Sequence, residues 1–163
     1  MVIEHEKRYG SWTGTEVGEF LRESRIPLRI GFFGGSGGLI VPVWYQYDDG
    51  RLFCCSPAKS ALVKGLKENP VIAFDISTNE IPYKGVRGRA RATCSFAASR
   101  QPLEVLLQKY LNDTNNELSQ WLLSRTDEEV VIELEIAWLT SWDFSARMSD
   151  IERIGERLDG ADL

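Results

Sequence analysis

The chain has 163 residues, carries a formal net charge of −5 and is 43% hydrophobic. This length is enough to bury one hydrophobic core without metal or disulfide support, so we expect a single domain over residues 1–163. The acidic balance argues against a nucleic-acid-binding protein, which would carry a basic stripe, and no run of about 18 apolar residues is present that could cross a membrane.

Histidine and cysteine usage restricts the chemistry that side chains can perform. His5 is the only histidine and lies in a polar N-terminal segment, so neither a Ser-His-Asp triad nor a two-histidine metal site is expected. The odd set of Cys54, Cys55 and Cys94 has no C-x-x-C spacing and fits reduced, buried thiols. The N-terminus lacks the apolar stretch of a signal peptide, which predicts a cytoplasmic protein. We therefore expect a bound cofactor to carry any reaction.

The first elements are a helix and a strand. A helix is predicted over residues 13–24, because Thr13 and Glu16 have the spacing of a capping box and Pro27 ends the pattern. Alternating apolar residues then predict a strand over residues 28–32. The glycines of residues 34–38 fit no phosphate-binding motif and are interpreted as a hairpin loop.

A second hairpin follows and leads into a helix. Residues 38–47 are predicted to form one strand, the Asp-Asp-Gly of residues 48–50 a turn with positive φ, and residues 51–56 the return strand. A helix is predicted over residues 58–68. We expect the backbone N–H groups of Ser60 and Ala61 to be unpaired at its start, close to Lys59 and Lys64, which would form an anion site.

The second half of the chain contains strands over residues 71–76, 85–94 and 129–138 and a helical pair over residues 101–110 and 117–125. In the helical pair Trp121 and Leu122 are expected to face inward as packing residues, and in the last strand Trp138 is expected to be buried with Ile132, Leu134 and Ile136. About six strands, mainly antiparallel, with helices inserted between them, tend to close into a small barrel. The charged tail of residues 149–163 is expected to be either a peripheral helix or partly disordered.

One predicted strand, residues 85–94, has two contrasting faces. Small residues occupy one face, which suggests that something bulky packs there. Arg87, Arg89 and Arg91 occupy the other, where they could bind an anion or pair with Glu133 and Glu135 on the last strand. We favour the ion pairs for Arg91 and leave both interpretations open for Arg87 and Arg89.

A family resemblance rests on three segments in order: VPVWYQYDDGRLFCCSPAKSALVKGLKENPVIAF, then PYKGVRGRARA, then a terminal strand leading to SWDFS. This succession resembles the pyridoxamine 5'-phosphate oxidase-like flavin-binding split-barrel family. The resemblance covers about residues 26–148 and implies a mainly β fold with inserted helices, a six-stranded antiparallel split barrel.

The resemblance also implies a homodimer that binds FMN at its interface. The flavin ring would lie along the strand of Val41, Pro42, Val43 and Trp44. The phosphate would lie near Ser56, Lys59, Ser60 and Lys64, and Trp142 would approach from the partner chain. Without the resemblance, Trp44 would be interpreted as barrel packing and the two lysines as solvated helix residues.

One departure concerns the phosphate. Many relatives have an Arg-Lys pair where this chain has Ala61 and Leu62, so Lys59, Lys64, Arg87 or Arg89 would have to replace it. We expect an FMN-dependent oxidoreductase acting on a small molecule other than pyridoxamine phosphate, with no side chain as acid, base or nucleophile. The alternatives are a non-catalytic protein that binds a flavin, a deazaflavin (F420) or haem, and a structural dimer without ligand.

Overall fold

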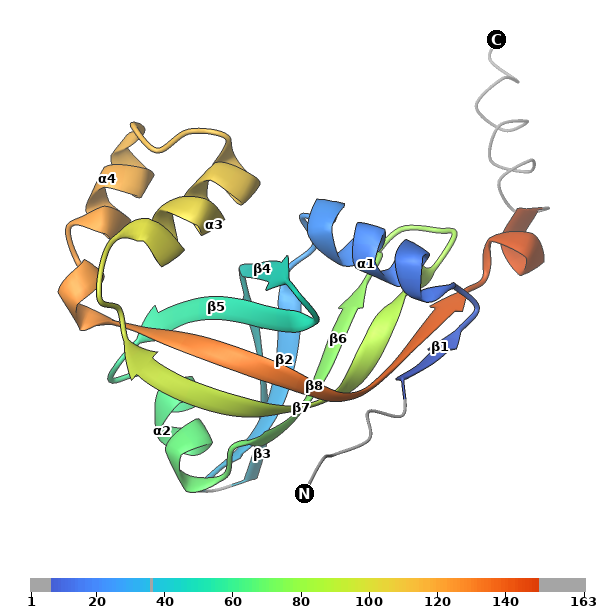
Figure 1. Ribbon diagram of the computed structural model, residues 1–163, viewed down its shortest axis with the longest axis horizontal. Helices are drawn as coiled ribbons and strands as arrows, with labels where there is room; N and C mark the ends of the chain where they lie inside the picture. The colour runs from blue at the N-terminus through green and yellow to red at the C-terminus, as the bar shows by residue number, and fades with distance from the viewer. Residues whose placement is uncertain (1–6, 36, 150–163) are drawn as a thin grey trace, which may run out of the picture.

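The computed structural model describes residues 7–35 and 37–149, which form one curved sheet covered by helices (Figure 1). The strands are β1 (Lys7–Gly10), β2 (Leu28–Gly34), β3 (Gly37–Val43), β4 (Tyr45–Asp48), β5 (Arg51–Pro57), β6 (Val71–Ser77), β7 (Lys84–Phe96) and β8 (Glu129–Asp143). The helices are α1 (Gly14–Glu23), α2 (Ala61–Glu68), α3 (Gln101–Leu111) and α4 (Glu117–Leu123), followed by a 3-10 turn, Thr126–Glu128. His5 and most of the expected peripheral tail, from residue 150 onward, lie outside the described residues.

The two edge strands of the main sheet follow each other in the chain. The strand order is β3-β2-β6-β7-β8-β5-β4, with β1 paired in parallel to β8 outside this path. All other pairs are antiparallel. The mainly β split barrel with inserted helices is therefore confirmed.

The chain changes sheet edge at Trp44. Residues 38–47 were expected to be one strand, but β3 ends at Val43, β4 begins at Tyr45, and the two pair with different neighbours, β2 and β5. The described part therefore contains eight strands rather than six, because this strand is divided and β1 is added. Trp44 consequently lies in the gap where the barrel is split.

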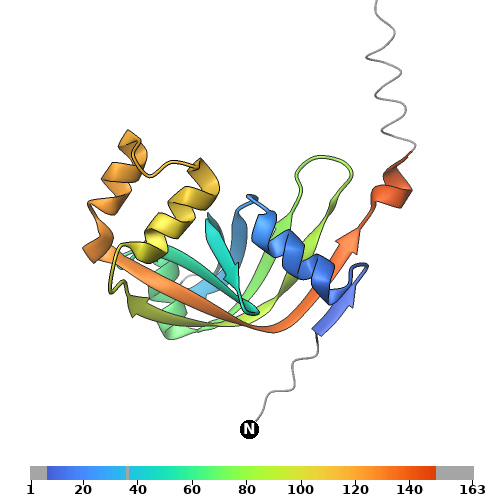
Figure 2. The same ribbon diagram turned by 45° about the horizontal axis from the view of Figure 1, so that its top comes forward.

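The helices are arranged around this gap. α1 and the α3–α4 pair lie on the same side of the sheet with β4 between them (Figure 2), and β4 contacts both α1 and α3. α2 lies away from them and packs against β2. No helix in the described ranges is long and apolar enough to cross a membrane.

Several local predictions are confirmed. Thr13 caps α1: its hydroxyl accepts a hydrogen bond from Glu16 N at 3.3 Å, and its own N–H donates to the Glu16 carboxylate at 2.7 Å. The turn after β4 has positive φ at Asp49 (42°) and Gly50 (78°), as the Asp-Asp-Gly sequence predicts. These features depend on residues close in sequence, which is why the sequence alone indicates them.

The small side chains of β7 do face a bulky residue. Val86, Ala90 and Ala92 are buried on the inner face of the barrel. A Cβ atom added to Gly88 would lie 2.7 Å from Cε1 of Phe74 in the neighbouring strand β6. Gly88 therefore provides the space that the Phe74 ring occupies.

A bulge in β8 reverses the expected orientation of Trp138. Arg89 pairs with Trp138 and Ala90 with Ile136, so Ala137 is the extra residue. Ile136 remains buried, whereas Trp138 turns to the outer face and is half-buried, with the Arg89 guanidinium 5.5 Å from the ring centroid. The expectation that Trp138 belongs to the buried row is wrong for this reason.

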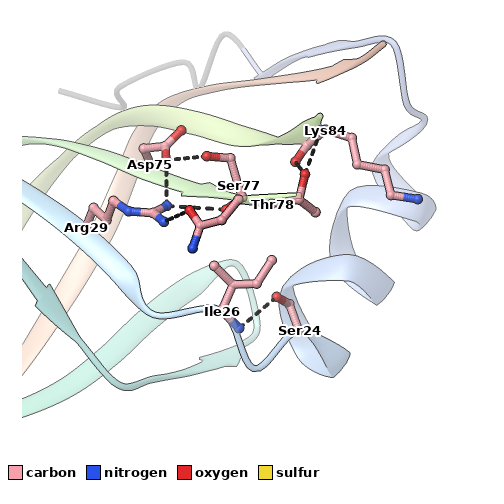
Figure 3. A network of polar contacts seen from close by, with 8 residues as sticks. Ser24, Ile26, Arg29, Asp75, Ser77, Thr78 and Lys84 are labelled. Carbon is pink, nitrogen blue, oxygen red and sulfur yellow. Dashed lines mark hydrogen bonds and ion pairs between the residues drawn. The ribbon is translucent and has the colours of Figure 1, made fainter. Parts of the chain in front are cut away.

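A polar network joins the start of β2 to the end of β6 and the start of β7 (Figure 3). Arg29 donates to the Asp75 carboxylate at 3.1 Å and to the Asn79 side chain at 2.6 Å. In the loop between β6 and β7, Lys84 N donates to the Thr78 hydroxyl at 3.1 Å. These bonds hold the loop against the sheet, and Arg29 also lies opposite Pro42 of β3, two residues before Trp44.

Candidate functional site

A pocket of about 570 Å³ opens beside Trp44, between the ends of β3 and β5 and the α3–α4 pair. Its volume lies within the range of roughly 300–1,000 Å³ that is usual for small-molecule sites. Most of its lining is apolar, and the residues are Pro27, Pro42, Val43, Trp44, Cys55, Ser56, Pro57, Leu103, Leu106, Trp121, Leu122, Arg125 and Glu129. The arrangement suits a largely apolar, planar ligand.

Helix α3 holds Trp44 in place. The indole of Trp44 stacks on the ring of Tyr110, with centroids 5.1 Å apart and planes inclined by 11°. The Tyr110 hydroxyl accepts a hydrogen bond from the backbone N–H of Tyr45 at 3.2 Å. One side chain of α3 therefore supports both the indole and the backbone at the point where the chain changes sheet edge.

Helix α4 presents a second indole to the pocket. Trp121 was expected to face inward, but it is 55% exposed, and the Arg125 guanidinium lies 5.1 Å from its ring centroid. The buried positions of α4 are Ser119 and Leu123, which are one turn apart, so Trp121 falls between them on another face. Leu122 is half-buried against the small cluster around Leu107, as expected.

Ser56, near the end of β5, and Ser60, in the loop that follows, form a hydrogen bond with each other. Ser56 Oγ donates to Ser60 Oγ at 2.9 Å, and Ser60 Oγ accepts from Val63 N at 3.1 Å as the cap of α2. Ser60 N donates to the Pro57 carbonyl at 2.8 Å, so the expectation that this N–H is unpaired is wrong. The cap also explains why α2 begins at Ala61 rather than at residue 58.

Arg125 and Lys59 both lie near Glu128, at the edge, or rim, of the pocket. Arg125 bonds to the Glu128 carboxylate at 2.8 Å, and this hydrogen bond lowers the pKa of Glu128 below its usual range, with a smaller contribution from Lys59. The backbone N–H of Ala58 donates to the Glu128 carbonyl at 2.8 Å, which brings the loop that carries Lys59 to this rim. The rim is therefore suited to the anionic part of a ligand.

The titratable groups deeper in the pocket are Cys55 and Glu129. Burial, with a further contribution from the charge of Glu129, raises the pKa of Cys55 to about 12, so the thiol stays protonated at neutral pH. Burial also raises the pKa of Glu129 above its usual value. Cys54, Cys55 and Cys94 are all free, as the sequence predicts, and burial raises the pKa of each. A thiolate nucleophile is therefore not expected here.

The structure brings some of the sequence-predicted residues together and separates others. Pro42, Val43, Trp44 and Ser56 line the pocket, and Lys59 and Ser60 follow directly in the adjoining loop. The others lie elsewhere. Val41 packs on the barrel core, Lys64 is exposed on α2, and Arg87 and Arg89 are exposed on the outer face of β7. Trp142 of β8 lies opposite Gly85 of β7, and its ring centroid is 5.3 Å from that of Phe144.

Among the pocket residues that sequence reasoning missed are Trp121, Arg125 and Glu129. The i, i+4 spacing of Trp121 and Arg125 is a signal that could have been noticed, because these positions are neighbours on a helix. No local signal identifies Glu129, whose proximity to Trp44 depends on the sheet pairing of β5 with β8.

The outer face of the sheet carries the arginine row and a second, separate pocket. Arg91 lies opposite Glu135, the position that the expected cross-strand ion pair requires. Glu133, the other carboxylate of the expected pairs, forms its ion pair with Arg51 of β5 at 2.7 Å. Arg89 lines a pocket of about 510 Å³. Exposed apolar side chains share that face: Phe33 is 65% exposed, Ile40 74% and Val71 47%.

The positions of the missing Arg-Lys pair do not face the pocket. Ala61 is exposed at the start of α2, and Leu62 is buried in the barrel core with 2% exposure. A lysine at position 62 would enter that core rather than reach the rim at Lys59. In the described lining of the pocket Arg125 is the single cation, and Lys59 lies in the adjoining loop.

Comparison with known proteins identifies the fold. No protein-family model matches the chain, and no curated protein matches it. A solved F420 reductase has a TM-score of 0.63 and 15% identity, covering 74% of this chain and 94% of its own. A Listeria innocua protein, provisionally described as a pyridoxamine 5'-phosphate oxidase, has a TM-score of 0.59 and 11% identity, covering 80% and 97%.

An FAD-binding protein from Mesorhizobium loti is similar in the same way, with a TM-score of 0.57 and 16% identity, covering 80% of this chain and 93% of its own. At these identities the likeness establishes the fold. The chain therefore has the split-barrel fold of the pyridoxamine 5'-phosphate oxidase-like proteins, which confirms the resemblance at that level.

Proposed function

We propose that this chain binds FMN or a closely related flavin in the pocket at Trp44 and acts as a flavin-dependent oxidoreductase on a small molecule. The observation that carries the proposal is the pocket itself: an apolar cavity whose lining contains one supported indole, a second indole and the cation Arg125. The shared fold with an F420 reductase and an FAD-binding protein supports this choice of ligand class.

The proposed division of roles follows from the side chains. Trp44 has one ring face against Tyr110, so its other face is where we expect an aromatic ligand to stack. Lys59 and Arg125 are the cations best placed for the phosphate, because the rim at Glu128 brings their segments together. A bound flavin supplies the hydride- or electron-accepting ring, and the chain binds it, orients it and excludes water.

We further propose that a second copy of the chain covers the exposed outer face of the sheet. Exposed apolar patches of this kind commonly mark interaction surfaces. The patch contains Ile40 and Phe33, the two most exposed of its large apolar side chains, and Arg89 lines the pocket beside them. The patch extends over β2, β3 and β6. It therefore adjoins the proposed flavin pocket, because the last residues of β3 line that pocket.

The rival function is a non-catalytic carrier of a flavin, deazaflavin or haem. The pairing of Arg125 with Glu128 at 2.8 Å favours it, because a cation already engaged by a carboxylate binds a phosphate weakly, and weak binding suits reversible loading. Haem is the least supported of these ligands, since the described lining of the pocket contains no histidine, methionine or tyrosine to ligate the iron.

A spectrum and a titration test the proposal. We expect the purified protein to show oxidised-flavin absorption bands, or to quench FMN fluorescence to saturation at about one flavin per chain. A colourless protein that leaves FMN and F420 fluorescence unchanged would contradict it. Reduction of the bound flavin by NAD(P)H or reduced deazaflavin, followed by reoxidation with a small-molecule acceptor, would distinguish the oxidoreductase from the carrier.

A further inference from the structure

Glu129 occupies an unusual position for a carboxylate. It is the first residue of β8, pairs with Pro57 of β5, and is only 8% exposed. Cys55 and Pro57 lie on the same face of the sheet, and all three residues line the pocket at Trp44. The Glu129 backbone is fixed, because its carbonyl accepts a hydrogen bond from Ala97 N at 3.1 Å.

The side chain of Glu129 lacks a partner of its own. Among the described residues no hydrogen bond or ion pair to its carboxylate is recorded, and the nearby cation, Arg125, bonds to Glu128 at 2.8 Å. The Ser56 hydroxyl donates to Ser60, and the Cys55 thiol is a weak donor. Among the described residues the side-chain atoms that are buried without a partner are Tyr45 Oη and Trp142 Nε1, so the Glu129 oxygens reach the open space of the pocket, where water or a ligand can donate to them.

Resting on the proposed function, we propose that Glu129 accepts a hydrogen bond from an N–H group on the edge of the planar ring bound at Trp44. Glu129 would thereby select heteroaromatic rings that carry an imide or amide N–H, such as the pyrimidine-dione edge of a flavin or deazaflavin, over rings that present only acceptors. In the described lining, Glu129 supplies the single carboxylate, and the aromatic and aliphatic residues around it do not discriminate between such rings.

The test pairs a change in the protein with a change in the ligand. Fluorescence titration measures the dissociation constants of FMN and of FMN methylated at N3, which lacks the imide N–H, for the full chain and for Glu129→Leu. A hydrogen bond to a charged group contributes enough that we expect the unmodified protein to prefer FMN over the methylated form by roughly 10- to 100-fold. In Glu129→Leu we expect that preference to disappear.

Two further variants make the result specific. Glu129→Gln keeps an acceptor oxygen of similar reach without the charge, so it is expected to retain part of the preference. Glu135→Leu changes an exposed carboxylate farther along the same strand and is expected to retain all of it. Circular dichroism on each variant checks that the fold is intact.

The outcomes separate this inference from the proposal on which it rests. Tight binding of FMN and its methylated form with equal affinity, or an undiminished preference in Glu129→Leu, would overturn the role of Glu129 while leaving the flavin site in place. Binding of neither compound by the unmodified protein would overturn the flavin site and, with it, this role.

Discussion

Trp44 and Tyr110 stack face to face, with ring centroids 5.1 Å apart, although 66 positions separate them in the chain and they belong to the sheet gap and to α3. The contact joins the helical pair to the barrel at the place where β3 ends and β4 begins. Because the Tyr110 hydroxyl also accepts from Tyr45 N, the same side chain serves both stability and the geometry of the pocket.

Removing the Tyr110 hydroxyl separates these two roles. In Tyr110→Phe the ring stack is kept, but the backbone N–H of Tyr45 loses its partner. We expect the free energy of unfolding to fall by about 1–3 kcal/mol, the usual cost of an unsatisfied buried donor. Urea denaturation measures the change; unaltered stability would mean that water replaces the phenol as acceptor.

The free face of Trp44 is expected to contribute to flavin binding. Trp44→Leu removes the aromatic platform, and we expect the dissociation constant for FMN to rise roughly 2- to 12-fold, corresponding to a stacking contribution of about 0.5–1.5 kcal/mol. Trp12→Leu is the matched control, because Trp12 packs on Phe20 of α1, away from the pocket. Equal losses in the two variants would indicate a general effect on folding rather than stacking.

Lys59 and Lys64 are expected to differ in their effect on the phosphate. Lys59→Ala should weaken FMN roughly two- to fivefold, as an exposed charge does, and leave riboflavin unchanged because riboflavin lacks the phosphate. Lys64→Ala should change neither, since Lys59, and not Lys64, lies close enough to Glu128 at the rim to lower its pKa. Fluorescence titrations of both ligands measure this. A loss of riboflavin affinity in Lys59→Ala would contradict a phosphate role.

The outer sheet face is expected to govern the oligomeric state. Ile40 is 74% exposed, and Ile40→Lys places a charge in the proposed dimer interface. We expect the mass in solution, measured by light scattering, to fall from that of two chains to that of one. Leu118→Lys, which changes a 48% exposed residue on α4, should leave the dimer intact. A dimer that survives Ile40→Lys would place the interface elsewhere.

Glu129 is expected to reduce the stability of the ligand-free protein at neutral pH. Burial raises its folded-state pKa above the usual 4.5, so the folded protein binds more protons than the unfolded chain between the two values. Stability is therefore lost as pH rises through this window. Glu129→Gln, which cannot ionise, should be more stable than the unmodified protein at pH 7, and this difference should vanish below the unfolded pKa. Thermal melts across this pH range measure the difference, and a variant that is less stable at pH 7 would contradict the prediction.

Much of the secondary structure could be predicted because it depends on neighbouring residues. The Thr13 and Glu16 capping box, the positive φ at Asp49 and Gly50, and the alternation along β7 are all local, and each was identified correctly. The order of elements was enough to indicate the split barrel. Within the site, Pro42, Val43, Trp44 and Ser56 could be named because the family resemblance rests on the continuous segment that contains them, from the end of β3 to the end of β5.

What the tertiary structure decided depends on contacts between distant segments. The division of residues 38–47 at Trp44 follows from closure of the sheet, because the two edges need strands that pair with different partners. The bulge at Ala137 turns Trp138 outward through the register of β7 with β8. Trp121, Arg125 and Glu129 reach the pocket because α4 packs on α3, α3 contacts β5, and the start of β8 pairs with β5. Periodicity along one segment carries no information on where another segment will pack, so these residues could be assigned to the site only from the folded chain.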